Sequence, residues 1–315
     1  MTWSADIAPI VQRHCIRCHT AGGFAPFSLA TYEEALMRAE AIKAAVAGGD
    51  MPPWDAASDV GHFANDRRLS PQEIELVTSW VNGGSPEGDG AFVEASLVLD
   101  GLVVPLANEV VTEESERDAR VTLQLQPGYT LTRWTFEPGV PAIVESADLE
   151  LGNRWLGTWT PGEAAIDFPD QAGVALPESS LFTVNISYRQ PAERAVDYSR
   201  LRLWITRTPD LKTVRATTVI RSWRTTSRSQ VFAVRPEDDD KEVRVVARFA
   251  DGHVVPIGSF EPPRTSAHPT YRLASPLSLP AGTRVESTAP VRVLYVEEPL
   301  PPKPAAPPAR QRRRP

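Results

Sequence analysis

The spacing of apolar residues changes near residue 90, and this change divides the chain into two parts that must fold differently. Before it, apolar residues recur every three or four positions, which is typical of amphipathic helices. After it, short β-branched or aromatic segments are separated by proline and glycine, which is typical of antiparallel strands. Proline supplies 30 of the 315 residues, about twice average usage, and this frequency disfavours an all-helical protein.

Three helices are predicted before the change of pattern. The first contains Pro9, which a helix tolerates only in its first turn. The second covers residues 35–46 and ends at a glycine pair. The third begins at Ser70-Pro71, a helix-capping serine followed by proline at the first helical position. These patterns predict an all-α domain over residues 1–88.

Seven segments are the clearest predicted strands: 120–126, 131–136, 181–188, 200–206, 242–249, 283–288 and 291–296. Because they follow one another without helical spacers, they predict an all-β sandwich domain over residues 97–298. Residues 89–96 are predicted to be a linker. Residues 299–315, with seven prolines and four arginines, are predicted to be a disordered tail.

The formal net charge of −7 disfavours broad nucleic-acid binding on electrostatic grounds. The basic residues are concentrated at the end of the chain, where the predicted tail carries five of them and no acid. Such a tail can dock on acidic lipid or on an acidic partner, or it can be a disordered end without a role. No stretch approaches the roughly 18 consecutive apolar residues that a spanning helix needs, so no transmembrane segment is expected.

The run Cys15-Ile16-Arg17-Cys18-His19 is a Cys-x-x-Cys-His motif, which indicates covalent attachment of c-type haem. Two sulfurs on one turn can each form a thioether with a haem vinyl group, and His19 then lies under the iron as its proximal ligand. A redox dithiol and a zinc site are the alternatives. The first calls for a preceding strand in a βαβ unit, and the second calls for a further pair of ligands. A helical pattern precedes the motif and the chain has only two cysteines, so haem is favoured.

The second axial ligand of the iron is expected to be Met51, in the run Met51-Pro52-Pro53-Trp54. Prolines restrict the backbone and can hold a thioether sulfur at the iron, and ligation by His and Met is a known cytochrome pattern. Core packing is the alternative role for Met51. His62 is the rival ligand, whereas His14 is expected at the surface.

Residues 4–88 resemble the monohaem class I c-type cytochromes. The resemblance rests on CIRCH, on GGFAPFSL, on MPPW, and on a closing helix with the sequence RRLSPQEIELVTSWVNGG. It implies that a backbone carbonyl near Pro26 orients the ring of the proximal histidine. It also implies that Trp54 and Trp80 pack against the haem, while generic core packing is the alternative for both.

Residues 117–296 resemble the copper type II monooxygenases of the peptidylglycine α-hydroxylating type, which implies a pair of jelly-roll-like sandwiches. The matching text is RWLGTWTPGEAAIDFPDQAGVALPESSLFTVNISY, then DYSRLRLWIT, then YRLASPLSLPAGTRVEST. Together, the two resemblances imply an all-α cytochrome c domain followed by an all-β, jelly-roll-like sandwich pair.

The copper ligands of that second family are missing. Glu145-Ser146 stand where the family has a His-His pair, Ser187-Tyr188 where it has His-Tyr, and residues 236–239 where it has Pro-His-x-His. Beyond residue 90 only His253 and His268 remain, and no methionine. Carboxylates replace imidazole and thioether poorly at copper, so no copper is expected. The acidic run 237–241 is predicted to be a solvated hairpin tip, with a calcium site as the alternative.

Three functions follow as hypotheses. The first is an electron carrier with one covalent haem, whose non-catalytic β-sandwich docks it to redox-partner proteins, for example within a membrane-associated complex. The second is a copper-dependent monooxygenase with a fused cytochrome as its electron donor. The third is a structural protein that builds an assembly, in which haem conducts electrons. Because haem c is attached outside the cytoplasm, a periplasmic or extracellular location is expected. No secretory signal is visible, so the numbering is expected to start after a removed leader or at an internal position.

Overall fold

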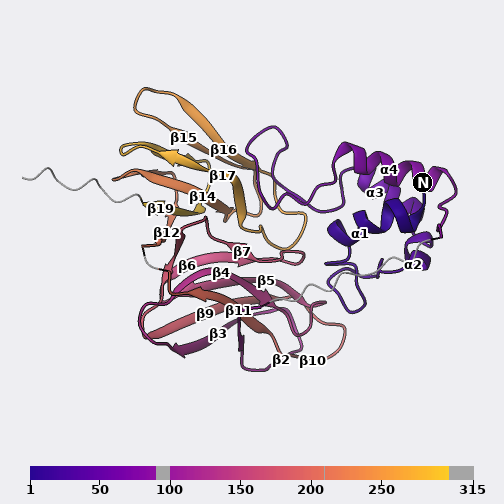
Figure 1. The fold of residues 1–315 in the computed structure, drawn as a ribbon, viewed down its shortest axis with the longest axis horizontal. Coiled ribbons are helices and arrows are strands. Elements are labelled where there is room, and N and C mark those ends of the chain that lie inside the picture. Colours follow the sequence, from indigo (N-terminus) through magenta and orange to yellow (C-terminus); the bar gives the residue numbers. More distant parts are fainter. Residues whose placement is uncertain (90–99, 209, 298–315) are drawn as a thin grey trace, which may run out of the picture.

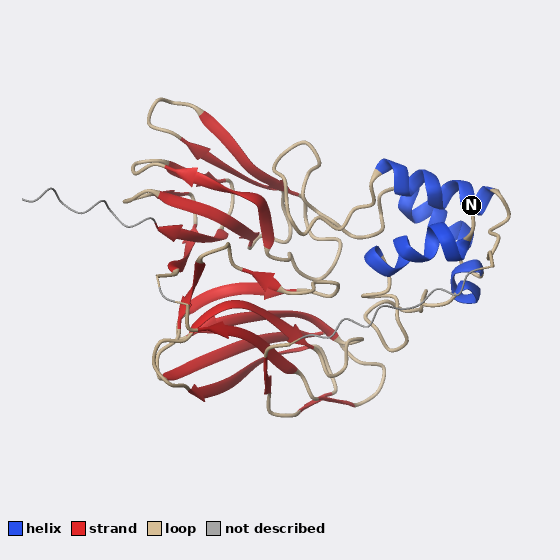
Figure 2. Cartoon of the chain, in the orientation of Figure 1, coloured by secondary structure: helices blue, strands red, loops and turns tan. Residues whose placement is uncertain are grey.

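The computed structural model describes residues 1–89, 100–208 and 210–297. A small helical region lies at one end of a much larger β-body (Figure 1). Figure 2 shows that strands make up most of the regular structure. The predicted tail 299–315, and all of the predicted linker 89–96 except its first residue, lie outside the described residues.

The helical region begins with a π-helical turn and contains four short α-helices. Their bounds are η1 Trp3–Ile7, α1 Ala8–His14, α2 Tyr32–Leu36, α3 Ala39–Ala47 and α4 Pro71–Asn82. The proline of α1 lies in its first turn, as its fixed φ requires. Thr31 and Ser70 cap α2 and α4 through reciprocal capping boxes with Glu34 and Glu73.

The expected all-α domain is wrong. The described chain is mostly β-sheet, and its α-helices are only five to twelve residues long. The physical reason lies in residues 51–69, where two consecutive prolines prevent a helix and buried aromatic side chains draw the chain into the β-body. Ala56 and Phe63 form β-bridges with Phe260 and Leu273 there. This segment therefore belongs structurally to the β-body as much as to the helices.

The first sandwich of the β-body has two sheets. One sheet runs in the order β3 (Ser115–Gln124), β9 (Ser179–Tyr188), β5 (Val144–Leu151), β6 (Arg154–Trp159). The other contains β1 (Leu102–Pro105), β11 (Arg200–Thr206), β4 (Thr130–Glu137), β7 (Ile166–Asp167) and β8 (Ala172–Ala175). Both sheets contribute side chains to one apolar core, with Trp134 and Val184 fully buried in it. A small ribbon of β2 (Glu109–Val111) and β10 (Ala195–Asp197) lies beside it.

The second sandwich is built in the same way around its own core. One sheet runs β12 (Lys212–Val219), β19 (Val291–Glu297), β14 (Ser229–Pro236), β17 (Tyr271–Leu279). The facing sheet runs β13 (Ser222–Arg224), β18 (Arg284–Ser287), β15 (Val243–Arg248), β16 (Val254–Phe260). Parallel pairing of β8 with β12 joins one sheet of each sandwich into a single nine-stranded sheet. The two sandwiches therefore share a backbone hydrogen-bond network.

Each of the seven segments predicted as strands overlaps a strand of the structure: β3, β4, β9, β11, β15, β18 and β19. Among the described residues, no helix is long and apolar enough to cross a membrane. The third predicted helix is present as α4, and Val77, Trp80 and Val81 are its buried side chains, as the apolar spacing indicates.

Candidate functional site

The Cys-x-x-Cys-His motif forms a tight turn at the end of α1. Cys15 is the C-cap of this helix, and its backbone N–H still donates to the carbonyl of Val11. The backbone N–H groups of Cys18 and His19 both donate to the carbonyl of Cys15, at 3.1 and 2.9 Å. The helix and these two bonds hold the two thiols and the imidazole within one turn of backbone.

The ring of His19 is oriented by a backbone carbonyl. Its Nδ1 lies 3.1 Å from the carbonyl oxygen of Phe27, and its ring packs against that of Phe27 with centres 4.6 Å apart. A proton on Nδ1 completes this hydrogen bond and leaves the lone pair of Nε2 for a metal. The resemblance implied an orienting carbonyl near Pro26, and the carbonyl in contact with His19 is that of the next residue, Phe27.

Burial opposes thiolate formation at both cysteines. It raises the pKa of Cys15 to about 12, and the nearby Cys18 thiol adds to this shift. The pKa of Cys18 is also raised, mainly by burial, although Arg67 and Arg17 oppose the shift. A redox dithiol needs a lowered thiol pKa, because the thiolate is the nucleophile. A thioether has no proton to lose, so this environment suits covalent attachment better than dithiol chemistry.

A loop of the β-body lies against the motif. Gly162 has a φ of +88°, and a Cβ at this position would lie 3.2 Å from Sγ of Cys18. Arg67, from the segment between α3 and α4, donates to the carbonyl of Pro161 at 2.8 Å and to Oγ1 of Thr160 at 3.1 Å. The side of the motif that carries Cys18 is therefore in direct contact with the first sandwich.

A second contact joins the loop after the motif to the β-body. Arg189 donates to the carbonyl of Phe24 at 2.7 Å, and its guanidinium lies 4.3 Å from the centre of the Phe24 ring. Neither Arg67 nor Arg189 was singled out from the sequence. Because the partners of Arg67 and Arg189 lie 93 to 165 positions away, no local pattern signals these contacts.

Met51 lies just after α3, and its side chain is 44% exposed. Its backbone N–H donates to the carbonyl of Ala45 at 3.2 Å, which continues the hydrogen bonding of the helix end. Its role as the second axial ligand stays a prediction. His62 is also exposed. His14 already has partners, with Nδ1 3.1 Å from the carbonyl of Arg67 and Nε2 3.3 Å from Glu73.

The two tryptophans expected to pack against haem lie in different cores. Trp80 is buried in the helical core beside Trp3, with ring centres 5.8 Å apart, and its Nε1 donates to the carbonyl of Pro86. Trp54 is buried in the second sandwich, where its ring lies 5.0 Å from that of Tyr271 and 6.1 Å from that of Phe63. The structure gives no support for haem packing by Trp54, and the role of Trp80 stays a prediction.

The residues of the motif fit a c-type haem. Two thiols on one turn and an imidazole with a free Nε2 are the donor set that the group requires. The hydrogen bond from His19 to the Phe27 carbonyl is the outer contact that metal-binding histidines usually make.

The positions equated with copper ligands lie around one cleft between the two sandwiches. This cleft, of about 840 Å³, is lined by Glu145, Ser146, Ser187, Tyr188 and Asp239 among others. Most of its charged lining residues are acidic: Glu114, Glu116, Asp118, Glu145, Asp148 and Asp239, against the single Arg235. Within residues 1–89, 100–208 and 210–297, no three His, Cys, Asp or Glu side chains are placed to hold a metal ion together.

The two histidines of the β-body differ in solvent exposure. His253 is exposed in the turn before β16. His268 is fully buried, with Nδ1 3.1 Å from the hydroxyl of Tyr271 and Nε2 3.9 Å from Asp239. Burial lowers the pKa of His268 to about 4, and the charge of Arg235 acts in the same direction.

No known protein family matches the chain, and no curated protein does. Among solved structures, the chain is similar to the major capsid protein P2 from bacteriophage PM2. The sequence identity is 10% and the TM-score is 0.28, and the alignment covers 61% of this chain and 97% of that one. A similarity this weak supports no inference about function.

Proposed function

We propose that this protein transfers electrons through one c-type haem bound covalently to Cys15 and Cys18, with His19 as the proximal iron ligand. The observation that carries the proposal is the geometry of His19, whose Nδ1 is held by the Phe27 carbonyl at 3.1 Å. When bound, haem supplies an iron centre that accepts and releases one electron. The turn that ends α1 keeps the two sulfurs and the imidazole together for this purpose.

Each residue of the site has a separate task in this proposal. The two cysteines anchor the group, and the Phe27 carbonyl fixes the orientation of the His19 ring. Met51 is the proposed second axial ligand, and the Pro52-Pro53 pair limits its backbone freedom. The contact between Cys18 and the loop at Gly162 places the β-body next to the anchoring turn.

The β-body serves as a non-catalytic docking or assembly domain in this proposal. Its partners are redox proteins of a membrane-associated complex, and the protein works on the periplasmic or extracellular side, where haem c is attached. The cleft between the sandwiches carries carboxylates and hydroxyls at the positions of copper ligands, and such groups are poor ligands for redox copper. This composition favours an electron carrier over a copper monooxygenase.

Expression of the full chain together with a cytochrome c maturation system tests the proposal. After acid-acetone extraction of the denatured protein, the haem absorbance is expected to stay with the polypeptide at about one haem per chain. Reversible one-electron reduction should then be seen by spectroelectrochemistry. If the pigment extracts freely, the covalent attachment is refuted.

Cysteine variants sharpen this test. Cys15→Ser and Cys18→Ser should each leave one vinyl group unreacted, which shifts the α-band of the reduced pyridine adduct to longer wavelength. The double variant should lose covalent haem completely. His14→Gln is the matched control, because His14 lies beside the motif but already contacts Arg67 and Glu73. Equal haem content in the double variant and the control would contradict the proposal.

A further inference from the structure

The segment that carries Met51 runs from the end of α3 to the edge of the second sandwich (Figure 1). At the helix end, the backbone N–H groups of Asp50 and Met51 both donate to the carbonyl of Ala45, at 2.9 and 3.2 Å. Residues 55–57 then pair with residues 259–261, at the end of β16, through two backbone hydrogen bonds of 2.8 and 2.9 Å. Met51 therefore lies between two fixed points that are only a few residues apart.

Arg264, in the connection between β16 and β17, bonds to both ends of this segment. Its backbone N–H donates to the carboxylate of Asp55 at 3.0 Å, and its guanidinium donates to the carbonyl of Gly49 at 2.6 Å. The guanidinium also lies 3.7 Å from the carboxylate of Asp50. One residue of the second sandwich thus holds residues 49–55 at both ends, and we call Asp55 and Arg264 the Met51 clamp.

The Asp55 side of the clamp is buried, with only 6% of the residue exposed. Burial raises the pKa of this carboxyl group, while the backbone N–H and the charge of Arg264, together with a hydrogen bond from the Tyr271 hydroxyl, oppose the shift. A buried carboxylate that lost these partners would be unfavourable, so Asp55 has one preferred position. Pro52 and Pro53 restrict the backbone between Met51 and this anchor.

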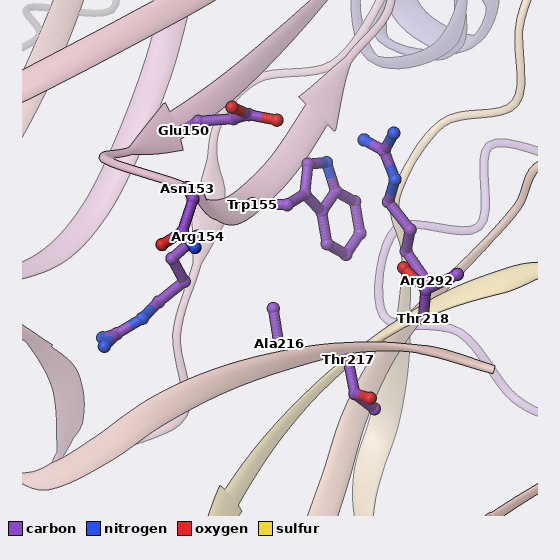
Figure 3. Close-up of a pocket in the computed structure, with 8 residues that line it drawn as sticks. All are labelled: Glu150, Asn153, Arg154, Trp155, Ala216, Thr217, Thr218 and Arg292. Carbon is purple, nitrogen blue, oxygen red and sulfur yellow. The ribbon is translucent and has the colours of Figure 1, made fainter.

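The second sandwich is itself fixed to the first sandwich. Figure 3 shows the side chain of Arg292, from β19, beside the indole of Trp155, from β6, and the guanidinium lies 5.6 Å from the centre of that ring. Arg292 also pairs with Asp148 of β5 at 3.3 Å, and these contacts add to the backbone pairing of β8 with β12. Because the loop at Gly162 in the first sandwich touches Cys18, the β-body contacts both the Cys-x-x-Cys-His motif and the Met51 segment.

We propose that Asp55 and Arg264 are positioning residues for Met51, so that the second sandwich controls how firmly the second axial ligand is held. The inference rests on the proposed function, because it requires haem at the Cys-x-x-Cys-His motif and Met51 as a ligand of its iron. Asp55 and Arg264 act through the backbone of residues 49–55 and not by contact with the iron. The β-body then has a task besides docking, since a displacement of the connection between β16 and β17 would move Met51.

Hydrogen–deuterium exchange of the full chain without haem tests the clamp itself. Arg264→Ala removes the hydrogen bond to the Gly49 carbonyl and should speed exchange of the Met51 amide by about fivefold. Arg264→Lys keeps a cation that can donate to the same carbonyl, so it should restore most of the protection. Arg248→Ala is the matched control, because the Arg248 side chain is 45% exposed, against 42% for Arg264, and pairs with Glu286 in the same sandwich. This control should leave the exchange of the Met51 amide unchanged.

Haem-loaded protein supplies a readout that a purely structural role would not change. Imidazole competes with Met51 for the iron, so its apparent affinity rises when Met51 is held less firmly. Arg264→Ala and Asp55→Ala should each bind imidazole about fivefold more tightly than the unchanged protein and show a weaker sulfur-to-iron absorption band. Met51→Ala should bind imidazole most tightly of all. Arg264→Lys and Arg248→Ala should bind it as the unchanged protein does.

The outcomes separate this inference from the proposed function. Circular dichroism shows whether each variant is folded, and Arg264→Ala, at a partly exposed position, decides the matter if Asp55→Ala does not fold. Unchanged imidazole affinity in Arg264→Ala, together with tighter binding in Met51→Ala, would overturn the inference and leave the proposed function intact. Unchanged exchange of the Met51 amide in Arg264→Ala would also overturn it. Equal imidazole affinity in Met51→Ala and the unchanged protein would show that Met51 is not the ligand, and would overturn both that part of the proposed function and the inference that rests on it.

Discussion

The guanidinium of Arg67 lies 3.1 Å from the carboxylate of Glu163, and this ion pair ties the segment before α4 to the first sandwich. Glu163 is almost completely buried and also contacts Arg272 and Asn65. Arg67 further donates to the loop that touches Cys18. The position of the Cys-x-x-Cys-His motif against the β-body therefore depends on a small buried network of charged and polar side chains.

Arg67→Ala should lower the free energy of unfolding by about 2–4 kcal/mol, because it leaves the buried Glu163 with one cationic partner fewer and removes two further hydrogen bonds. Arg68→Ala is the matched control, since Arg68 pairs with Asp66 at the surface. Its cost should be about 0–1 kcal/mol. Urea unfolding of both variants, followed by circular dichroism, measures the difference. An equal loss in the free energy of unfolding for both variants would show that the Arg67–Glu163 ion pair stabilises the protein no more than a surface pair does.

Sequence patterns predicted those helices and strands that are determined by residues close together in the chain. The Ser70-Pro71 pair predicted where α4 begins, because a capping serine and a proline at the first helical position act within one turn. Alternation of apolar residues predicted β19 and β9 for the same reason. Residues 51–69 could not be predicted in this way, because their conformation depends on strands about two hundred positions later, as the Ala56–Phe260 bridge shows.

In the candidate site, too, the contacts between residues close in sequence were predictable and the long-range contacts were not. The Cys-x-x-Cys-His motif is local in sequence, and the resemblance to c-type cytochromes implied an orienting carbonyl near Pro26, one residue from the observed contact with Phe27. Haem packing by Trp54 was implied by the resemblance alone, and this side chain packs against Tyr271 instead. Neighbours in sequence diverge here because a proline pair turns the chain away from α3 and a large apolar side chain is buried in whichever core it reaches.

Replacement of Met51 by histidine should lower the reduction potential of the haem-loaded protein, because a thioether favours Fe(II) more than an imidazole does. The expected change is on the order of 0.1 V or more, within the roughly 0.8 V that axial ligands can span. The weak sulfur-to-iron absorption band should also disappear. Met37→His is the control, because Met37 is 77% exposed and no role at the iron is expected for it. An unchanged spectrum in Met51→His would exclude Met51 as the ligand and leave His62 as the next candidate.

The β-body should retain no copper. The cleft between the sandwiches offers carboxylates and hydroxyls, while redox copper requires imidazole or soft sulfur ligands. Haem-loaded protein is to be incubated with excess Cu(II), desalted and analysed for both metals. Iron near one per chain and copper near zero are expected. Two retained coppers per chain would contradict this prediction and would restore the monooxygenase hypothesis.

The stability of the protein should fall as the pH is lowered from about 6.5 towards 4, in part because of His268. Burial, together with Arg235, lowers the pKa of this imidazole to about 4 in the folded protein, whereas the ordinary value of 6.5 applies to the unfolded chain. In this window the unfolded chain binds a proton that the folded protein does not, so the unfolded state gains stability as the pH falls. Above pH 6.5 both states are neutral at this residue, and the effect vanishes.

The expected loss from this residue is about 2 kcal/mol between pH 6.5 and pH 5, from roughly 1.4 kcal/mol for each pH unit. Urea unfolding at pH 7 and pH 5 measures the loss in the unchanged protein and in His268→Gln, whose side chain does not titrate. His268→Gln should be less stable at pH 7, because the amide replaces the buried contact with Tyr271 imperfectly, but it should lose less stability on acidification. His253→Gln is the control, since His253 is exposed, and it should keep the full pH dependence. The same loss in His268→Gln as in the unchanged protein would show that other groups, such as Asp239 beside the ring, account for the acid sensitivity.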